Sequence, residues 1–214
     1  MLKIKLDKKG LKEHFRYCWW QYLIAVCFSL FFLGFIYLQT EYRVPENKRI
    51  DIYIQSNGAD KEKILKQLRM LKVDFKTPIE SIDLKVIPLL TDNDYAQAMQ
   101  LFAYIMAGEG DIYIMSKERY NSLAAQGALV NLEKYIDILS KIINKDSLNG
   151  TRVSAFDGEN YSKPTLYGIS CKNLKIDGLD EKQADNLVAC ISINNNNDLN
   201  VVPYFLSLIK NFAR

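Results

Sequence analysis

Histidine is almost absent from this chain of 214 residues: one is present, His14, and it lies in the N-terminal tail. The rest of the chain therefore lacks a histidine for an acid–base pair, for a Ser-His-Asp triad or for a metal site. Enzymes that depend on such groups are excluded. We expect a protein that is not an enzyme and that binds no cofactor or metal.

Cysteine is scarce as well, and no CxxC spacing occurs among the four cysteines. Structural zinc sites and thiol-exchange motifs are therefore poorly supported. Cys18 and Cys27 fall at or within an apolar stretch near the N-terminus. Cys171 and Cys190 fall in the later part of the chain, where export would permit a disulfide. The sequence allows a Cys171–Cys190 bridge and equally allows two buried thiols.

Phosphate-binding loops are missing, because neither GxxxxGK nor GxGxxG occurs. An excess of positive charge is missing too: residues 41–214 carry 22 basic and 23 acidic side chains. Proteins that bind nucleic acid usually carry a basic stripe. We therefore expect no nucleic acid among the partners.

Charge of either sign is absent between Arg16 and Glu41. The twenty residues Trp19–Leu38 would form a helix of about 30 Å, which is the thickness of the hydrocarbon layer of a bilayer. Aromatic residues cluster at both ends of this stretch, as in membrane-interface belts. A cleavable signal peptide would have a shorter apolar region that ends in small residues, whereas Phe35–Thr40 is bulky. The pattern predicts an uncleaved transmembrane helix over residues 18–40.

The distribution of Lys and Arg predicts the orientation of this helix. Six basic residues precede it against two acidic ones, and basic residues near a span favour the cytoplasmic side. We expect residues 1–17 to be a basic cytoplasmic tail, residues 41–48 a linker and residues 49–214 an extracytoplasmic α/β domain. The predicted location is the plasma membrane, crossed once, with the C-terminal domain outside the cell.

Apolar periodicity in residues 49–214 alternates between period two, typical of strands, and a helical stripe. Strands are predicted at 49–55, 82–87, 111–115, 165–170 and 187–193, and helices at 60–71, 95–106, 117–125, 132–143 and 204–212. Strand, helix and strand in alternation indicate βαβ units. The predicted fold is an open, largely parallel sheet with helices on both faces, preceded by one transmembrane helix.

Three phrases of the sequence carry a resemblance to a known family. They are Ala107–Ile114, Leu123–Tyr135, and the strand Ala189–Ile193 with the following Phe205–Ile209. Together they resemble the first lobe of bacterial extracellular solute-binding proteins of the ABC-transporter type. Members of that family close two lobes over a ligand, and a full second lobe does not fit in this chain. The resemblance implies a shortened, one-lobed, membrane-anchored relative.

Candidate ligand-binding residues follow from the predicted topology. Ligands of open α/β sheets bind beyond the carboxyl ends of the strands. In this chain that edge would carry Ser56, Asn57, Asp92, Asn93 and Ser116. Each of these residues is also a typical turn or helix-cap residue, which is the simpler interpretation.

Two functions remain open from the sequence. The first is a membrane-anchored, non-enzymatic binding or accessory domain that takes a small-molecule ligand or a protein partner in or at the membrane. The second is a structural or interaction subunit of a bacterial envelope or secretion complex, in which the membrane helix itself packs against other helices.

Overall fold

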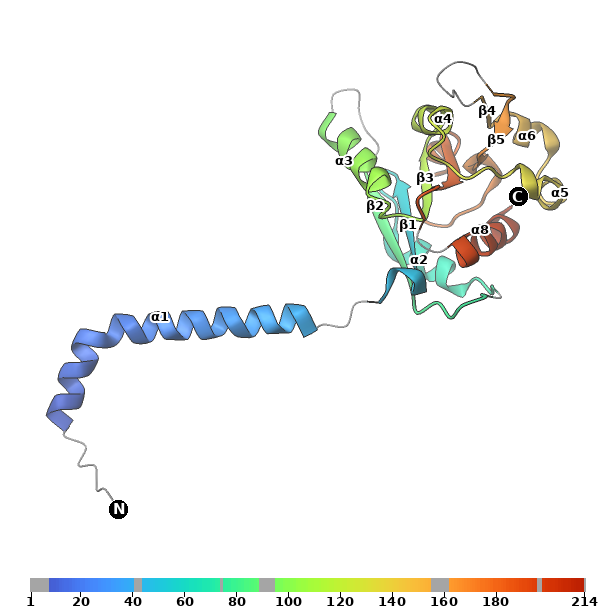
Figure 1. Ribbon diagram of the computed structural model, residues 1–214. Coiled ribbons are helices and arrows are strands. Elements are labelled where there is room, and N and C mark those ends of the chain that lie inside the picture. The colour runs from blue at the N-terminus through green and yellow to red at the C-terminus, as the bar shows by residue number, and fades with distance from the viewer. Residues whose placement is uncertain are drawn as a thin grey trace. The chain divides into compact units, whose positions relative to one another are not determined.

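Two units, Met1–Arg43 and Val44–Arg214, make up the chain in a computed structural model (Figure 1). The model describes residues 8–40, 44–73, 75–88, 95–154, 162–195 and 198–213. The linker residues 41–43 and the candidate site residues Asp92 and Asn93 lie outside the described residues.

The first unit is the helix α1 (Lys8–Thr40). Within it, Arg16–Leu38 is long and apolar enough to cross a membrane, with a mean hydropathy of 2.0. None of this window is buried within the structure. A helix over the predicted span is confirmed, and it begins earlier than expected because the basic tail continues the same helix; its position in a membrane stays a prediction.

A five-stranded sheet with the order β2-β1-β3-β7-β6 forms the centre of the second unit. Its strands are β1 (Arg49–Gln55), β2 (Ser81–Ile87), β3 (Ile112–Ser116), β6 (Gly168–Ser170) and β7 (Leu187–Ile191). The strands β1, β2 and β3 are parallel, whereas β7 is antiparallel to both of its neighbours. Four of the five strands thus run in one direction, which confirms the predicted, largely parallel sheet.

Helices cover both faces of this sheet, as the alternation of its side chains requires. On one face, Ile50, Ile52 and Ile54 pack with α2 (Lys61–Met70) and α8 (Asp198–Phe212). On the other face, Tyr53 and Tyr113 pack with α3 (Tyr95–Met106) and α4 (Lys117–Ala125). Figure 1 shows α3 and α8 on opposite sides of the strands.

Short elements complete the domain. They are η1 (Glu46–Lys48), η2 (Glu133–Tyr135), α5 (Ile136–Leu139), α6 (Lys145–Asn149), β4 (Arg152–Val153), β5 (Thr165–Leu166), η3 (Cys171–Asn173) and α7 (Glu181–Ala184). The strands β4 and β5 form a separate two-stranded sheet. The helix α7 lies at the carboxyl end of β1, where its Gln183 is hydrogen-bonded to Ser56 and Asn57.

Three predicted elements are wrong in their extent. Residues 132–143 form η2, α5 and turns instead of one helix, although Leu139 and Ile143 are buried as the stripe required. Residues 165–170 divide between β5 and β6, which belong to different sheets. The last helix begins at Asp198, so Pro203 lies inside it and not in its first turn.

Candidate functional site

The carboxyl edge of the sheet holds three of the five predicted ligand-binding residues. Ser56 and Asn57 directly follow β1, and Ser116 is the last residue of β3. Because β1 and β3 are parallel neighbours, the structure brings these residues to one edge. Ser116 stands at the N-cap of α4, but its side chain makes no capping hydrogen bond, contrary to the expected cap.

The side chain of Gln183, on α7, is bonded to the end of β1. The Ser56 hydroxyl donates to Gln183 Oε1 at 2.7 Å, and the Asn57 backbone N–H donates to the same oxygen at 3.1 Å. Gln183 Nε2 donates in return to the Asn57 carbonyl at 2.9 Å. Sequence reasoning missed Gln183, because nothing in its local pattern indicates a partner 127 positions away.

A second glutamine joins β1 to β3 at the same edge. Gln55 is buried, and its Oε1 accepts a hydrogen bond from the backbone N–H of Ser116 at 3.0 Å. This is the topological switch point of the sheet, where the chain order changes direction and ligands of open α/β folds often bind. Here the two glutamines bind the polar groups at the ends of the strands, so a ligand at this point would have to displace a side-chain amide.

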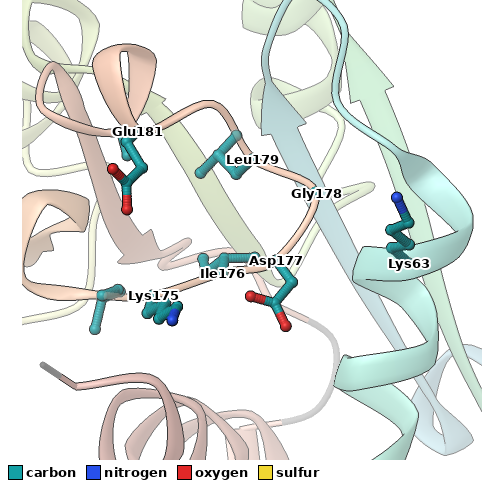
Figure 2. A pocket seen from close by; sticks show the side chains of 9 residues that line it. Lys63, Lys175, Ile176, Asp177, Gly178, Leu179 and Glu181 are labelled. Atoms are coloured by element: carbon teal, nitrogen blue, oxygen red, sulfur yellow. The ribbon is translucent and has the colours of Figure 1, made fainter.

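A pocket of about 440 Å³ lies between α2 and the segment that leads into α7. Its lining residues are Lys63, Leu174, Lys175, Ile176, Asp177, Gly178, Leu179, Glu181 and Ala184. Figure 2 shows Lys63 on one wall and Glu181 on the facing wall, with Asp177 between them. The pocket therefore adjoins the predicted edge without using its residues.

Hydrogen bonds donated by backbone N–H groups fix the shape of this pocket. The Asp60 N–H donates to the Gly178 carbonyl at 3.0 Å, and the Asp177 N–H donates to Gln67 Oε1 at 3.2 Å. Gly178 has a φ of 96°, which side-chain-bearing residues rarely adopt, and a Cβ there would lie 3.1 Å from the Asp60 carbonyl oxygen. At its other end, the Lys175 N–H donates to the Phe212 carbonyl at 2.7 Å. The loop is thus held against both α2 and α8.

Charged groups of both signs surround an apolar floor in this pocket. Leu174, Ile176 and Ala184 are buried, whereas lysine and carboxylate side chains stand around them. Lys63 also forms an ion pair with Asp60 at 3.1 Å. A hydrogen bond from the Lys63 backbone N–H, reinforced by the Lys63 side chain, lowers the pKa of Asp60. Such a lining can hold a small polar molecule, but it contains no paired nucleophile and base.

A tyrosine cluster on the opposite face of the sheet is a further concentration of polar groups. Tyr53 stacks on Tyr113 with ring centroids 5.2 Å apart and contacts Tyr104 at 5.3 Å. Lys85 Nζ donates to Tyr53 Oη at 2.8 Å and lies 3.7 Å from Glu109 Oε2. The bond to Tyr53 raises the pKa of Lys85, and burial raises the pKa of Tyr53. Because the rings stack on one another, this cluster is part of the core.

The two cysteines of the domain are free thiols in the structure. Cys171 belongs to the hydrophobic cluster on the α2 and α8 face, whereas Cys190 belongs to the cluster on the α3 and α4 face. The bridge that the sequence allowed is therefore not formed, because the two side chains enter different cores. Among the described residues, no group of three or more His, Cys, Asp or Glu side chains could hold a metal ion.

Comparisons with known proteins gave matches among solved structures alone. No protein-family model and no curated protein matches the chain. Among solved structures, the chain is similar to an N-glycan transport solute-binding protein from Streptococcus pneumoniae in complex with Man5GlcNAc. The TM-score is 0.40 and the sequence identity is 18%, and the match covers 59% of this chain and 25% of that chain. It is also similar to an extracellular solute-binding protein family 1 member from Alicyclobacillus acidocaldarius, with a TM-score of 0.41 and 18% identity over 60% of this chain and 29% of that chain.

A third similar structure is the galacto-N-biose-/lacto-N-biose I-binding protein of an ABC transporter from Bifidobacterium longum, in complex with lacto-N-biose. Its TM-score is 0.37, with 11% identity over 60% of this chain and 29% of that chain. The chain thus matches less than a third of the length of each of these three proteins. The sugars named here are ligands of those proteins.

Proposed function

We propose that this chain is a non-enzymatic binding domain, held at a membrane by α1, that takes a small polar solute in the pocket between α2 and α7. The observation that carries the proposal is the pocket of about 440 Å³ with its two lysines and two carboxylates around an apolar floor. Ligand sites commonly enclose about 300–1,000 Å³ and combine apolar walls with a few polar groups. The dimensions and the lining of this pocket meet both conditions.

The exposed apolar surface of α1 supports the membrane part of the proposal. The window Arg16–Leu38 has no protein cover, and soluble proteins rarely expose so large a continuous apolar area. In a bilayer, lipid would cover these side chains, and the helix would satisfy its own backbone hydrogen bonds. The basic residues before the span favour a cytoplasmic N-terminus, and with that orientation the α/β domain would lie outside the cell.

Anchoring also explains how a single lobe could serve as a receptor. A one-lobed pocket leaves part of its ligand in water, so we expect weak binding. A domain fixed at the membrane keeps a high local concentration near any membrane partner, which offsets weak affinity. The sequence resemblance to one lobe of the extracellular solute-binding proteins is consistent with this role.

A thermal-unfolding screen of the full chain in lipid nanodiscs tests the proposal. Sugars, amino acids and polyamines would be added singly. A solute that occupies the pocket at 100 times its Kd should stabilise the folded state by about 2.7 kcal/mol. Glu181→Gln should reduce the stabilisation, because it removes one carboxylate from the pocket wall.

Glu118→Gln provides the matched control, since Glu118 is an exposed carboxylate in the first turn of α4 and does not line the pocket. It should leave the solute effect unchanged. The absence of stabilisation by any solute, or equal losses in the two variants, would contradict a ligand site in this pocket.

A further inference from the structure

The strand β2 forms one lateral edge of the five-stranded sheet, because β1 is its only neighbour among the strands that the structure describes. It extends over seven residues, whereas β6, the strand at the opposite lateral edge, has three. Very short edge strands are one way in which proteins avoid pairing with other chains, and a longer one is a template for a further strand. The edge of β2 is therefore better suited than that of β6 to receive a partner strand.

The register of β1 and β2 shows which backbone groups of β2 face outwards. The Ser56 N–H donates to the Ile87 carbonyl at 2.9 Å, so the backbone groups of Ile87 point towards β1. In a strand, the backbone groups of successive residues point alternately to the two sides. The N–H and C=O groups of Ile82, Leu84 and Val86 therefore point away from β1.

Most of these outward groups have no hydrogen-bond partner in the part of the chain that the structure describes. The Ile82 carbonyl accepts a hydrogen bond from the Arg69 guanidinium at 3.3 Å, and Arg69 is an exposed side chain of α2. The outward N–H and C=O groups of Leu84 and Val86 are unpaired among the described residues. They can form a ladder with a further strand.

The side chains of β2 follow a symmetric order around its middle residue, Leu84. Ile82 and Val86 flank Leu84 on the face that packs with α2, and both are half-buried. Asp83 and Lys85 flank it on the opposite face. Reversing the strand about Leu84 exchanges Ile82 with Val86 and Asp83 with Lys85. The segment is therefore complementary to itself in antiparallel orientation, in apolar size and in charge.

The carboxylate of Asp83 forms no ion pair with any of the described residues. The Ser81 hydroxyl donates to it at 3.4 Å. At the adjacent position of β1 lies Asp51, which is paired with Arg49 at 2.7 Å. Burial raises the pKa of Asp51, and the nearby charge of Asp83 contributes to the increase. A cation supplied from outside the chain would stabilise the two neighbouring carboxylates.

Lys85 has the capacity to supply such a cation to a second chain. Its Nζ donates to Tyr53 Oη at 2.8 Å and lies 3.7 Å from Glu109 Oε2. An ammonium group has three donors, so these two contacts leave one for a further acceptor. The side chain of Lys85 is 53% exposed, which allows a carboxylate of another chain to reach it.

We propose that β2 pairs with β2 of a second copy of this chain, in antiparallel orientation about a two-fold axis at Leu84, so that the two sheets become one. Leu84 lies opposite its own copy and Ile82 opposite the partner's Val86, and these pairs exchange the outward backbone hydrogen bonds. Asp83 lies opposite the partner's Lys85 in the closer, non-hydrogen-bonded pairs. None of these residues lines the solute pocket, so the pairing is independent of the proposed function.

Charge also selects this register over its neighbours. If the axis passed through Asp83, the two copies of Asp83 would face each other, and an axis at Lys85 would bring the two lysines together. Like charges directly opposite one another destabilise a strand pair, whereas opposite charges stabilise it. An axis at Leu84 forms two opposite-charge pairs and no like-charge pair.

Charge exchange in the full chain tests this pairing. Two differently tagged copies are co-expressed, extracted in mild detergent and recovered through one tag, and the amount of the other tag is measured. Unaltered copies should be recovered together. When both copies carry Asp83→Lys, or both carry Lys85→Asp, recovery should fall by about tenfold, because both attractive pairs become repulsive.

Asp83→Lys in one copy and Lys85→Asp in the other should restore recovery, since every charge then faces its opposite again. Unfolding of either variant could not produce such a rescue. No joint recovery of the unaltered copies, equal recovery in all combinations, or no rescue in the mixed pair would overturn the proposal. Equal recovery in all combinations would place the association elsewhere in the chain, for example in α1.

Val86→Pro in both copies is a second test, and it leaves both charges in place. Proline is tolerated in an edge strand where its missing N–H faces solvent, so the fold should be retained, as circular dichroism would check. Joint recovery should be lost, because an outward donor is removed. Val86→Ala is the matched control, since it keeps the N–H, and its recovery should stay close to that of the unaltered chain. Full recovery of folded Val86→Pro would contradict pairing through β2.

Discussion

At the scale of single residues, burial strongly perturbs the two thiols of the domain. Burial raises the pKa of Cys171 to about 12, and burial also raises the pKa of Cys190. The two thiols occupy opposite faces of the sheet, so each is shielded by its own set of apolar side chains. Neither has the lowered pKa that marks a reactive cysteine.

We predict that the free energy of unfolding falls as the pH rises above about 8.5, the ordinary thiol pKa. Below that pH both thiols are protonated in both states and have no effect. Above it the unfolded chain loses protons that the folded chain retains, so each thiol lowers the stability by about 1.4 kcal/mol per pH unit. This loss continues until the pH reaches the raised pKa of the folded state. Urea unfolding of the full chain in detergent, followed between pH 7 and pH 10, measures it.

A Cys171→Ala, Cys190→Ala variant is the control for this prediction. It should be less stable at neutral pH because of the lost packing, but its stability should be nearly constant between pH 8.5 and pH 10. The ordinary tyrosine pKa is near 10, so buried tyrosines contribute mainly at higher pH. An unchanged slope in the double variant would contradict the assignment to the thiols.

At the scale of elements, the attachment of α7 to the end of β1 is the contact on which both the pocket and the strand edge depend. The helix α7 has four residues, too few to be stable alone. Its place is fixed by the three hydrogen bonds that link Gln183 to Ser56 and Asn57. Glu181 and Ala184, on the same short helix, line the pocket.

We predict that Gln183→Ala lowers the free energy of unfolding by about 1–3 kcal/mol, because it removes the bonding partner of the buried Ser56 hydroxyl. It should also weaken solute binding, since α7 would lose its attachment. Gln126→Ala is the control: Gln126 donates to the Ser122 hydroxyl at 3.3 Å on the exposed side of α4. Its effect should stay within about 0.5 kcal/mol. Equal urea midpoints for the two variants would show that the contact adds no stability.

The strand β1 was predictable because its side chains alternate without ambiguity. The observed β1 has the predicted bounds, since three isoleucines alternate with polar or aromatic residues between Arg49 and Gln55. Residues 132–143 were less predictable, because a stripe of buried apolar residues fits a series of turns as well as a helix. There Asn131 Oδ1 accepts a hydrogen bond from the Glu133 N–H at 2.8 Å, which starts a turn where a longer helix was expected.

The candidate site was predictable in its location and not in its residues. The rule for open α/β sheets indicates the carboxyl edge, where Ser56, Asn57 and Ser116 do lie together. Which groups remain open to a ligand depends on contacts between distant segments, such as Gln183 with Ser56. Lys63 and Glu181 line one pocket only after the chain has folded, and no spacing in the sequence relates them.

At the scale of the whole molecule, the two units have opposite relations to solvent. Residues 16–38 expose apolar side chains, and the contact of such side chains with water is unfavourable. The domain, in contrast, buries most of its apolar side chains. The chain is therefore expected to retain its fold in detergent or lipid and to aggregate in plain buffer. This contrast provides the basis for a test of topology.

We predict that protease added to intact cells degrades the domain and leaves residues 1–17 protected, because positive charge before the span favours a cytoplasmic N-terminus. Epitope tags at each end, followed by immunoblotting, measure the outcome. A variant with Lys3, Lys5, Lys8 and Lys9 changed to Gln should show a mixture of orientations. Protection of the C-terminal tag in the unaltered chain would reverse the assigned orientation.

The position of β7 has a consequence for the order in which the domain can fold during synthesis. This inner strand and α8, whose Tyr204, Phe205 and Leu208 are fully buried, follow the other four strands of the sheet in the chain. The sheet therefore cannot be completed until residues 187–212 have been synthesised. A premature stop before Leu187 would release a three-stranded remnant with a bare edge, which quality-control proteases would remove.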